Sequence, residues 1–167
     1  MHPTLSNRPR CPIDITVMGF EGRSWLDKLI MRLLGKPSHT VIAFGRTNSI
    51  LDVRPDFPLN WTLYSPSYLY WGVPTTLATF YNVHEDSVWK LLQWVEDNKG
   101  STYDVRGAMG LVLCWLKNAS NSFYCSNMVA AALHAAGLLP VHMTRVSPRQ
   151  LFVTIKAISA AVVTKRT

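Results

Sequence analysis

The chain has 167 residues, of which 48% are hydrophobic and 16% charged, and this composition excludes a disordered protein. The length fits a single domain over residues 1–167, with residues 1–11 as a flexible leader. The 17 Lys and Arg residues outnumber 10 acids and give a net charge of +7, but they are scattered along the chain. This pattern favours no specific nucleic acid and predicts a mild attraction to an anionic surface such as cell wall or phospholipid.

Three cysteines are too few, and odd in number, for a disulfide framework, and no Cys and His cluster has zinc-like spacing. We therefore expect neither a metal nor a cofactor. The polar N-terminus lacks the apolar core of a signal peptide. The longest apolar stretches, near Met109–Leu116 and Met128–Leu139, are too short or too interrupted to span a membrane. These features predict a soluble protein without an export signal, for which cytoplasm and virion are both open locations.

The first third of the chain predicts a strand, a helix and a hairpin. Alternating residues favour a strand over Pro12–Phe20. Apolar residues at helical spacing predict a helix over Ser24–Leu34 that ends at Gly35-Lys36-Pro37. The β-branched run His39–Phe44 and the run Ile50–Val53 predict two strands that pair as a hairpin through a turn at Asn48-Ser49.

Residues 54–74 combine prolines with aromatic residues and predict an excursion loop holding a strand or two. The aromatic residues are Trp61, Tyr64, Tyr68, Tyr70 and Trp71. Such clusters most often form core or lid, although they can also line a cleft. Thr76–Val83 predicts a further strand, and the next segment predicts a helix from His84 to about Asp97 with acids at its N-terminal end.

Helices dominate the predicted C-terminal part. Apolar periodicity favours helices over Tyr103–Leu116 and Phe123–Ala136, and a short helix over Ser147–Phe152. Val153–Val163 fits either a strand or a helix. Strands that alternate with segregated helices predict an α+β domain built around an antiparallel sheet.

Cys125 is the best candidate for a reactive group, because it occupies the first turn of its predicted helix. Unpaired amides and the helix dipole at that end favour a thiolate, which is the nucleophilic form. Most lone cysteines are small buried hydrophobic residues, and Cys114, in the middle of its predicted helix, fits that role. Cys11, in the polar leader, fits neither role clearly.

A thiol nucleophile needs a base within hydrogen-bond reach, and His39 is the strongest candidate. His134 lies nine residues along the Cys125 helix, which places it roughly 13 Å away. His2 falls in the leader, and His84 and His142 fit surface or capping positions. His39 opens a buried strand, where the scaffold holds it rigidly. A histidine buried for structural reasons fits the same pattern equally well.

A third group should orient the imidazole, and Asp52 is a candidate for this role. Alternation places Ile50 and Asp52 on one face of their strand, so that a hairpin brings Asp52 opposite the region of His39–Ile42. A solvent-facing carboxylate is the ordinary alternative for such a residue. Asp104 and Glu21 are weaker candidates for the same role.

Several segments in order resemble the circularly permuted, NlpC-type branch of the papain-like cysteine peptidases and amidases. The segments that carry the resemblance are Asp14–Phe20 with its following helix, Ser38–Phe44, Ile50–Val53, Tyr103–Gly110, Phe123–Val129, Ala135–Leu138 and Val146–Leu151. Each segment alone is weak evidence for the resemblance, but the segments follow in the same order and together span most of the chain. The resemblance implies a papain-like fold, an antiparallel sheet or half-barrel packed against helices.

The resemblance also implies that Cys125 is the nucleophile and His39 the base. Asp52 matches a position at which the family usually has Glu, and Asn127 departs from a usual Glu after the Cys-Ser pair. Tyr103-Asp104 matches a family motif that we interpret as structural. The backbone N–H of Cys125 is a candidate donor to an oxyanion, by analogy and by its place at a helix start.

Two functions therefore stay open. The first is a thiol hydrolase that cleaves an amide, in a peptide, a cell-wall peptide or an N-acyl or lipid amide, through Cys125, His39 and Asp52 and an acyl-enzyme. The second is a catalytically silent papain-like scaffold that serves as a structural or binding component of a phage or secretion assembly. Small size fits a phage or bacterial accessory protein, and the oligomeric state is open.

Overall fold

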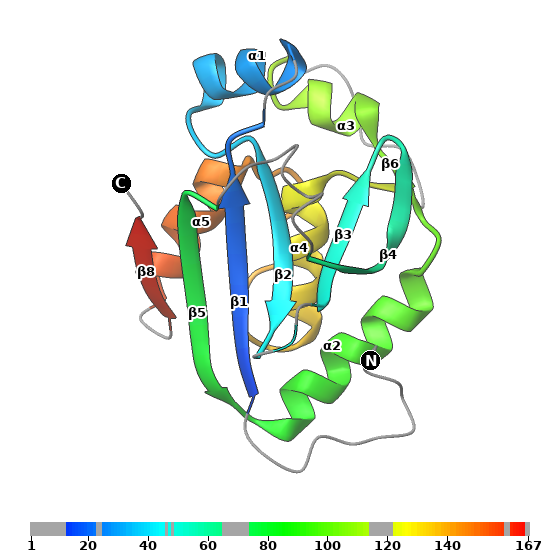
Figure 1. Ribbon diagram of the computed structural model, residues 1–167, viewed down its shortest axis with the longest axis vertical. Helices are drawn as coiled ribbons and strands as arrows, with labels where there is room; N and C mark the ends of the chain where they lie inside the picture. The colour runs from blue at the N-terminus through cyan, green and yellow to red at the C-terminus, as the bar shows by residue number, and fades with distance from the viewer. Residues whose placement is uncertain are drawn as a thin grey trace.

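The computed structural model describes residues 13–22, 25–45, 47, 49–64, 74–113 and 122–158, and the backbone of 161–165. It has an α+β architecture in which one antiparallel sheet, with strands of different lengths, is packed against helices (Figure 1). The sheet has the strand order β4-β3-β2-β1-β5-β8. The predicted α+β class is confirmed, whereas the papain-like fold stays a proposal. Within the described chain, no helix is both long enough and apolar enough to cross a bilayer.

The first strands of the chain lie side by side in the sheet, although α1 separates β1 from β2 in the sequence. They are β1 (Ile13–Phe20), β2 (His39–Phe44), β3 (Ser49–Arg54) and β4 (Phe57–Leu63). β5 (Thr76–Val83) returns to the other side of β1, and β8 (Ala161–Lys165) pairs with β5. Val17 of β1 lies between Ile42 of β2 and Ala78 of β5, so this central strand pairs with a neighbour on each side.

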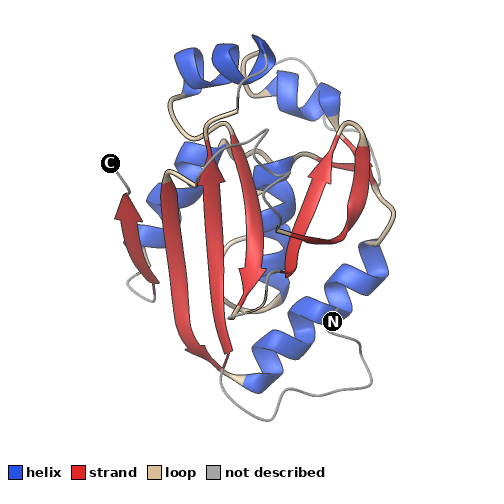
Figure 2. Ribbon diagram, in the orientation of Figure 1, coloured by secondary structure: helices blue, strands red, loops and turns tan. Residues whose placement is uncertain are grey.

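Within the described residues, five helices pack behind the sheet and at its ends (Figure 2). They are α1 (Trp25–Leu34), α2 (Glu85–Asn98), α3 (Val105–Gly110), α4 (Cys125–Ala135) and α5 (Pro148–Ala157). α4 packs against β2 and β3, and both α2 and α5 pack against α4. α1 and α3 lie together over one end of the sheet, at the top of Figure 1. The arrangement places the N-terminus of α4 beside the edge at which β1 ends and β2 begins.

The main core lies between the sheet and helices α2, α4 and α5. Its strand side includes Ile15, Val17 and Ile42, and its helix side includes Met128 and Leu133, all fully buried. α4 is buried almost all round, because its other side faces α2 and α5 rather than solvent. A smaller apolar cluster covers the opposite face of the sheet and comprises Phe20, Val41, Ala43 and Ile50.

The predicted strands His39–Phe44 and Thr76–Val83 are confirmed with the same bounds, and the hairpin of β2 and β3 is confirmed. The predicted excursion loop contains β4, which pairs with β3. Its Trp61 packs edge-on against Phe44 at a centroid distance of 5.1 Å and belongs to the core. Tyr68, Tyr70 and Trp71 lie outside the described residues, as do Cys11, Cys114 and the leader.

The predicted helix Tyr103–Leu116 is wrong at its start and shorter over the described residues, and Leu116 lies outside them. Tyr103 belongs to β6 (Thr102–Tyr103), which pairs in parallel with β7 (Ser122–Phe123). α3 then starts after Asp104, whose carboxylate accepts a hydrogen bond from Gly107 N at 2.7 Å, and it ends at Gly110. Phe123, predicted to open the next helix, belongs to β7 instead. A pairing between residues 20 apart in the chain outweighed local helical periodicity here.

The predicted helix Ser147–Phe152 extends to Ala157, so the first part of the ambiguous segment Val153–Val163 is helical. Its last part enters β8. Ser147 and Gln150 form a capping box that fixes where α5 starts. In α1 the predicted apolar face is only partly covered, because Ile30 is buried while Trp25 and Leu33 are exposed.

Candidate active site

The three predicted site residues come from three elements that meet at one end of the sheet. His39 is the first residue of β2, Asp52 lies in the adjacent strand β3, and Cys125 is the first residue of α4. All three are buried, with exposed fractions of 3%, 0% and 4% respectively. The structure therefore brings the three residues together, and their catalytic roles stay a prediction.

A hydrogen bond joins His39 to Asp52. The distance from His39 Nε2 to Asp52 Oδ1 is 2.9 Å, and both side chains are enclosed. The pair forms because β2 and β3 are neighbours and alternate residues of a strand share a face. The predicted partnership of these two side chains matches this geometry.

Asp52 has two further partners from its own strand. The backbone N–H of Val53 donates to Oδ1 at 2.8 Å, and Arg54 Nε lies 3.2 Å from Oδ2. The Arg54 guanidinium also stacks over the Phe57 ring, 5.2 Å from its centroid. A buried carboxylate is costly unless donors surround it. These partners therefore keep Asp52 anionic and fixed in position beside His39.

The sequence interpretation missed Arg54. The available signal was the spacing, since Arg54 follows Asp52 by two residues on the same strand and so shares its side of the sheet. A bulge between β3 and β4 lies at this point, where Asp52 is opposite Asn60 and Arg54 is opposite Phe57. Bulges of this kind are common beside functional sites because they redirect the chain.

Cys125 is a free thiol that contacts the segment carrying His39. Its Sγ lies 3.8 Å from the carbonyl oxygen of Ser38, a weak sulfur hydrogen bond. Ser38 is itself fixed, because its N–H donates to Phe20 O and its hydroxyl accepts from Gly22 N at 2.8 Å. Because Ser38 directly precedes His39, this contact places the thiol beside the segment that carries the imidazole.

The environment raises the pKa of His39 from 6.5 to about 10. Burial acts to lower the pKa, since it disfavours the charged imidazolium. The charge and hydrogen bond of Asp52, followed by the hydrogen bond and charge of Cys125, act in the opposite direction and prevail. The charged imidazolium is therefore the favoured form of His39.

Two hydrogen bonds to the backbone of Val146, one to its N–H and one to its carbonyl oxygen, fix the start of α4. The Val146 N–H donates to the Tyr124 hydroxyl at 3.0 Å, and the Ser126 hydroxyl donates to the Val146 carbonyl at 2.6 Å. We call this pair of bonds the Val146 clamp. Because Tyr124 and Ser126 flank Cys125, the clamp fixes the position of the nucleophile candidate.

Two tyrosines share the electrostatic environment of Cys125. Burial, with the Cys125 and Asp104 charges, raises the pKa of Tyr124 to about 12, against the opposing Val146 bond and Arg145. The pKa of Tyr103 is raised well above 10 by burial and then by Cys125, Asp27 and Asp52. Tyr103, which we interpreted as structural, is therefore a protonated phenol within electrostatic range of the thiol.

Other predicted candidates have different roles. His84 caps α2, where its Nδ1 accepts from Asp86 N at 3.3 Å. His134 bonds the Leu139 carbonyl at 3.0 Å at the far end of α4. Asp104 caps α3, and Glu21 pairs with Lys36 at 2.6 Å. No group of three or more His, Cys, Asp or Glu side chains suited to a metal ion occurs within the described part of the chain.

Comparison with protein-family models and with curated proteins finds no match to this chain.

We predict that Ser126→Ala lowers the free energy of unfolding by about 1–3 kcal/mol, because it leaves the buried Val146 carbonyl without its donor. Urea denaturation monitored by circular dichroism measures the loss. The matched control is Ser87→Ala in α2, which is only partly buried, and should change stability by less than about 0.5 kcal/mol. Equal losses in the two variants would contradict the role of the clamp.

We also predict that His39 makes stability depend on pH. A group whose pKa is raised by folding contributes stability that is fully present below pH 6.5 and is lost as the pH rises through about 10. Asp52→Asn removes the main cause of the increase, so it should flatten the fall in unfolding free energy between these limits. Urea denaturation across this range measures the slope. His84→Gln, which changes an exposed histidine, should keep the wild-type slope, and a wild-type slope in Asp52→Asn would rule out this origin.

Proposed function

We propose that the protein is a thiol hydrolase that cleaves an amide bond through Cys125, His39 and Asp52. The observation that carries the proposal is the buried 2.9 Å bond between His39 and Asp52, together with the Cys125 thiol at a helix start, whose Sγ contacts the carbonyl of Ser38, the residue before His39. A thiol, a histidine and an orienting carboxylate are the parts that nucleophilic acyl transfer requires. The ordered resemblance to the permuted NlpC-type peptidases and amidases supports the same assignment and a papain-like fold.

Each residue has a distinct role in the proposed reaction. The Cys125 thiolate attacks the carbonyl carbon of the amide, and the backbone N–H of Cys125 stabilises the oxyanion that forms. The C–N bond then breaks as His39 gives its proton to the leaving amine, which leaves a thioester on Cys125. Water next attacks the thioester while His39 takes its proton, and the carboxylic acid leaves. Asp52 holds the ring orientation and stabilises the imidazolium throughout.

The bonding of His39 assigns its two nitrogens. Since Nε2 bonds Asp52, Nδ1 is the nitrogen left to exchange a proton with Cys125. Asp52 takes the place of the Glu that is usual in the resembling family, and Val53 N and Arg54 fix the shorter carboxylate at hydrogen-bond distance from the ring. The amide substrate is open among peptides, cell-wall peptides and N-acyl or lipid amides.

The second candidate is a catalytically silent scaffold of the same fold, used in a phage or secretion assembly. One observation favours it: only 4% of Cys125 is exposed, so its thiol lies beneath the surface. The reactivity of the thiol separates the two candidates. An activated thiol reacts with iodoacetamide well below the ordinary cysteine pKa of about 8.5, whereas a buried structural thiol reacts slowly or not at all.

We expect the purified chain to release a burst of p-nitrophenolate from p-nitrophenyl acetate and to carry the acetyl group on Cys125. Cys125→Ala should abolish the burst while the fold is kept, and His39→Ala should slow acylation by about 10²–10⁴-fold. Stopped-flow absorbance and peptide mass spectrometry measure the two effects. Cys11→Ala and Cys114→Ala are matched controls that should keep the burst. A burst lost in Cys114→Ala instead would refute the assignment.

A further inference from the structure

The exposed side of α1 combines apolar and basic side chains. Trp25 is 74% exposed and Leu33 is 52% exposed, although neither is close to a chain end of the protein. Lys28 and Arg32 lie between them and are also exposed. Trp25, Lys28 and Arg32 follow one another at i, i+3 and i+7, so they share one side of the helix. Burial of the opposite side, at Asp27 and Ile30, leaves this side facing outward.

The exposed side of α5 repeats this combination. Arg149, Val153 and Lys156 are exposed at i, i+4 and i+7, with 62% of Val153 accessible. The other side of α5 is buried in the core through Leu151 and Ile155. Val153 thus places an aliphatic side chain, mostly exposed, between two cations.

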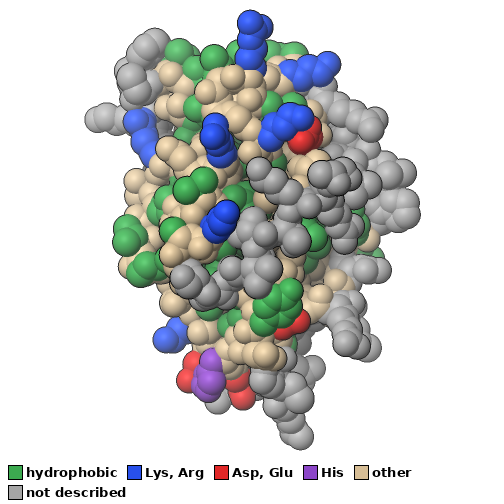
Figure 3. All heavy atoms as spheres, turned by 90° about the vertical axis from the view of Figure 1, so that its left-hand side faces the viewer, with side chains coloured by type: hydrophobic (Ala, Val, Ile, Leu, Met, Phe, Trp, Pro, Cys, Tyr) green, Lys and Arg blue, Asp and Glu red, His purple; other side chains and the backbone are tan. Residues whose placement is uncertain are grey.

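The two helices meet at a pair of adjoining hollows that share Arg149 and Val153. The first has a volume of about 530 Å³ and is lined by Leu33 of α1 and by Arg145. The second has a volume of about 490 Å³ and is lined by Lys36, Pro37 and Lys156. Neither lining includes an acidic residue, although Glu21 pairs with Lys36 nearby. Lys and Arg side chains gather over the upper part of this face, whereas Asp and Glu lie mostly at its lower end (Figure 3).

We propose that the exposed residues of α1 and α5, together with Lys36, form a surface that binds an anionic phospholipid bilayer. Basic side chains beside a bilayer attract anionic headgroups, and exposed Trp, Leu and Val side chains insert at the boundary between headgroups and acyl chains. A soluble polyanion would bind the cations, but it would gain no favourable contact from the aliphatic side chains among them. The combination, rather than the charge alone, selects the bilayer as the occupant.

The position of this surface relates it to the candidate active site. Lys36 and Pro37 form a wall of the second hollow, and the next two residues are Ser38, which contacts Cys125, and His39. A bilayer bound at α1 and α5 therefore lies at the same end of the sheet as the three site residues. This inference concerns attachment to a surface and goes beyond amide cleavage, so it stands or falls separately from the proposed function.

Sedimentation with lipid vesicles tests the proposal, with the full chain carrying Cys125→Ala so that turnover plays no part. The probes are vesicles of phosphatidylcholine alone and of phosphatidylcholine with about one-third phosphatidylglycerol, at about 0.15 M salt. We expect binding at least tenfold tighter to the anionic vesicles. Similar affinities for the two compositions would overturn the proposal.

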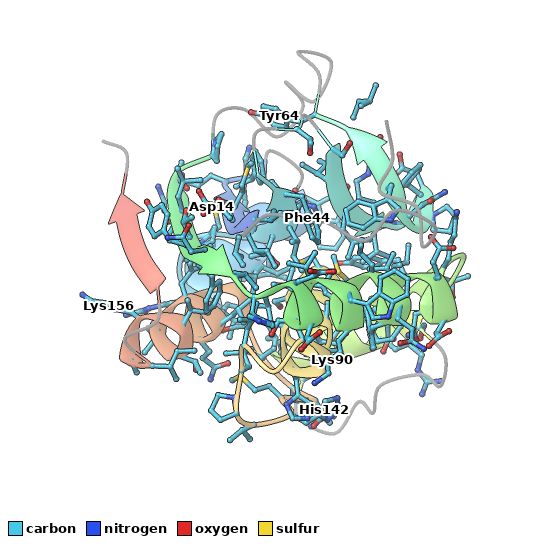
Figure 4. All side chains as sticks on the ribbon, turned by 90° about the horizontal axis from the view of Figure 1, so that it is seen from below. Asp14, Phe44, Tyr64, Lys90, His142 and Lys156 are labelled. Atoms are coloured by element: carbon cyan, nitrogen blue, oxygen red, sulfur yellow. The ribbon has the colours of Figure 1, made fainter. Side chains whose placement is uncertain are left out.

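Two pairs of matched variants test the charge and the apolar contributions separately. Lys156→Glu should weaken binding about tenfold, whereas Lys90→Glu, on α2 at a different side of the molecule, should not (Figure 4). Val153→Ser should weaken binding about threefold or more, whereas Val141→Ser, at a valine that is 65% exposed, should not. These four side chains are exposed, so each variant should fold, which circular dichroism checks.

Binding to heparin distinguishes a bilayer from a soluble polyanion. If the surface binds lipid, Val153→Ser weakens vesicle binding and leaves heparin binding unchanged. If Val153→Ser changes neither, while Lys156→Glu weakens both equally, the surface is a polyanion site and the proposal is overturned. Equal losses in Lys156→Glu and Lys90→Glu would also overturn it, because they would reflect net charge alone.

Discussion

The hydrogen bond between His39 and Asp52 constrains much of the fold around it, because neither ionised group is stable inside the protein alone. The bond requires β2 and β3 to be neighbours, and the second oxygen of Asp52 forms an ion pair with Arg54. The same charge keeps His39 protonated, so the adjacent Cys125 faces a cation rather than a neutral ring. The pairing of β2 with β3 and the charge of His39 are thus linked through a single buried contact.

Local patterns predicted several strands correctly, because those depend on neighbours in the chain. His39–Phe44 and Thr76–Val83 alternate or are β-branched, and the hairpin follows from a short turn. The errors come from distant contacts: Tyr103 and Phe123 join a parallel pair that no local period reveals. Periodicity also grouped Trp25 with Ile30 in α1, but it could not tell which of them the rest of the protein covers.

Arg54 and the Val146 clamp show a second limit of prediction from the sequence. Asp52 was identifiable from alternation, whereas the partners that stabilise it depend on a bulge and on the turn that follows. Ser126 looked like an ordinary helix residue, yet its hydroxyl bonds a peptide group 20 residues later. Residues that hold a site in place therefore escape pattern analysis more easily than the groups they hold, since their contacts are set by tertiary structure.

The Val146 clamp also has a consequence for synthesis on the ribosome. His39, Asp52 and Cys125 emerge well before Val146, but α4 is fixed at its start only when Val146 has bonded Tyr124 and Ser126. A growing chain that stops short of this residue contains all three side chains but lacks the bonds that fix the start of α4. The position of Cys125 in the fold is therefore fixed only after Val146 has left the ribosome.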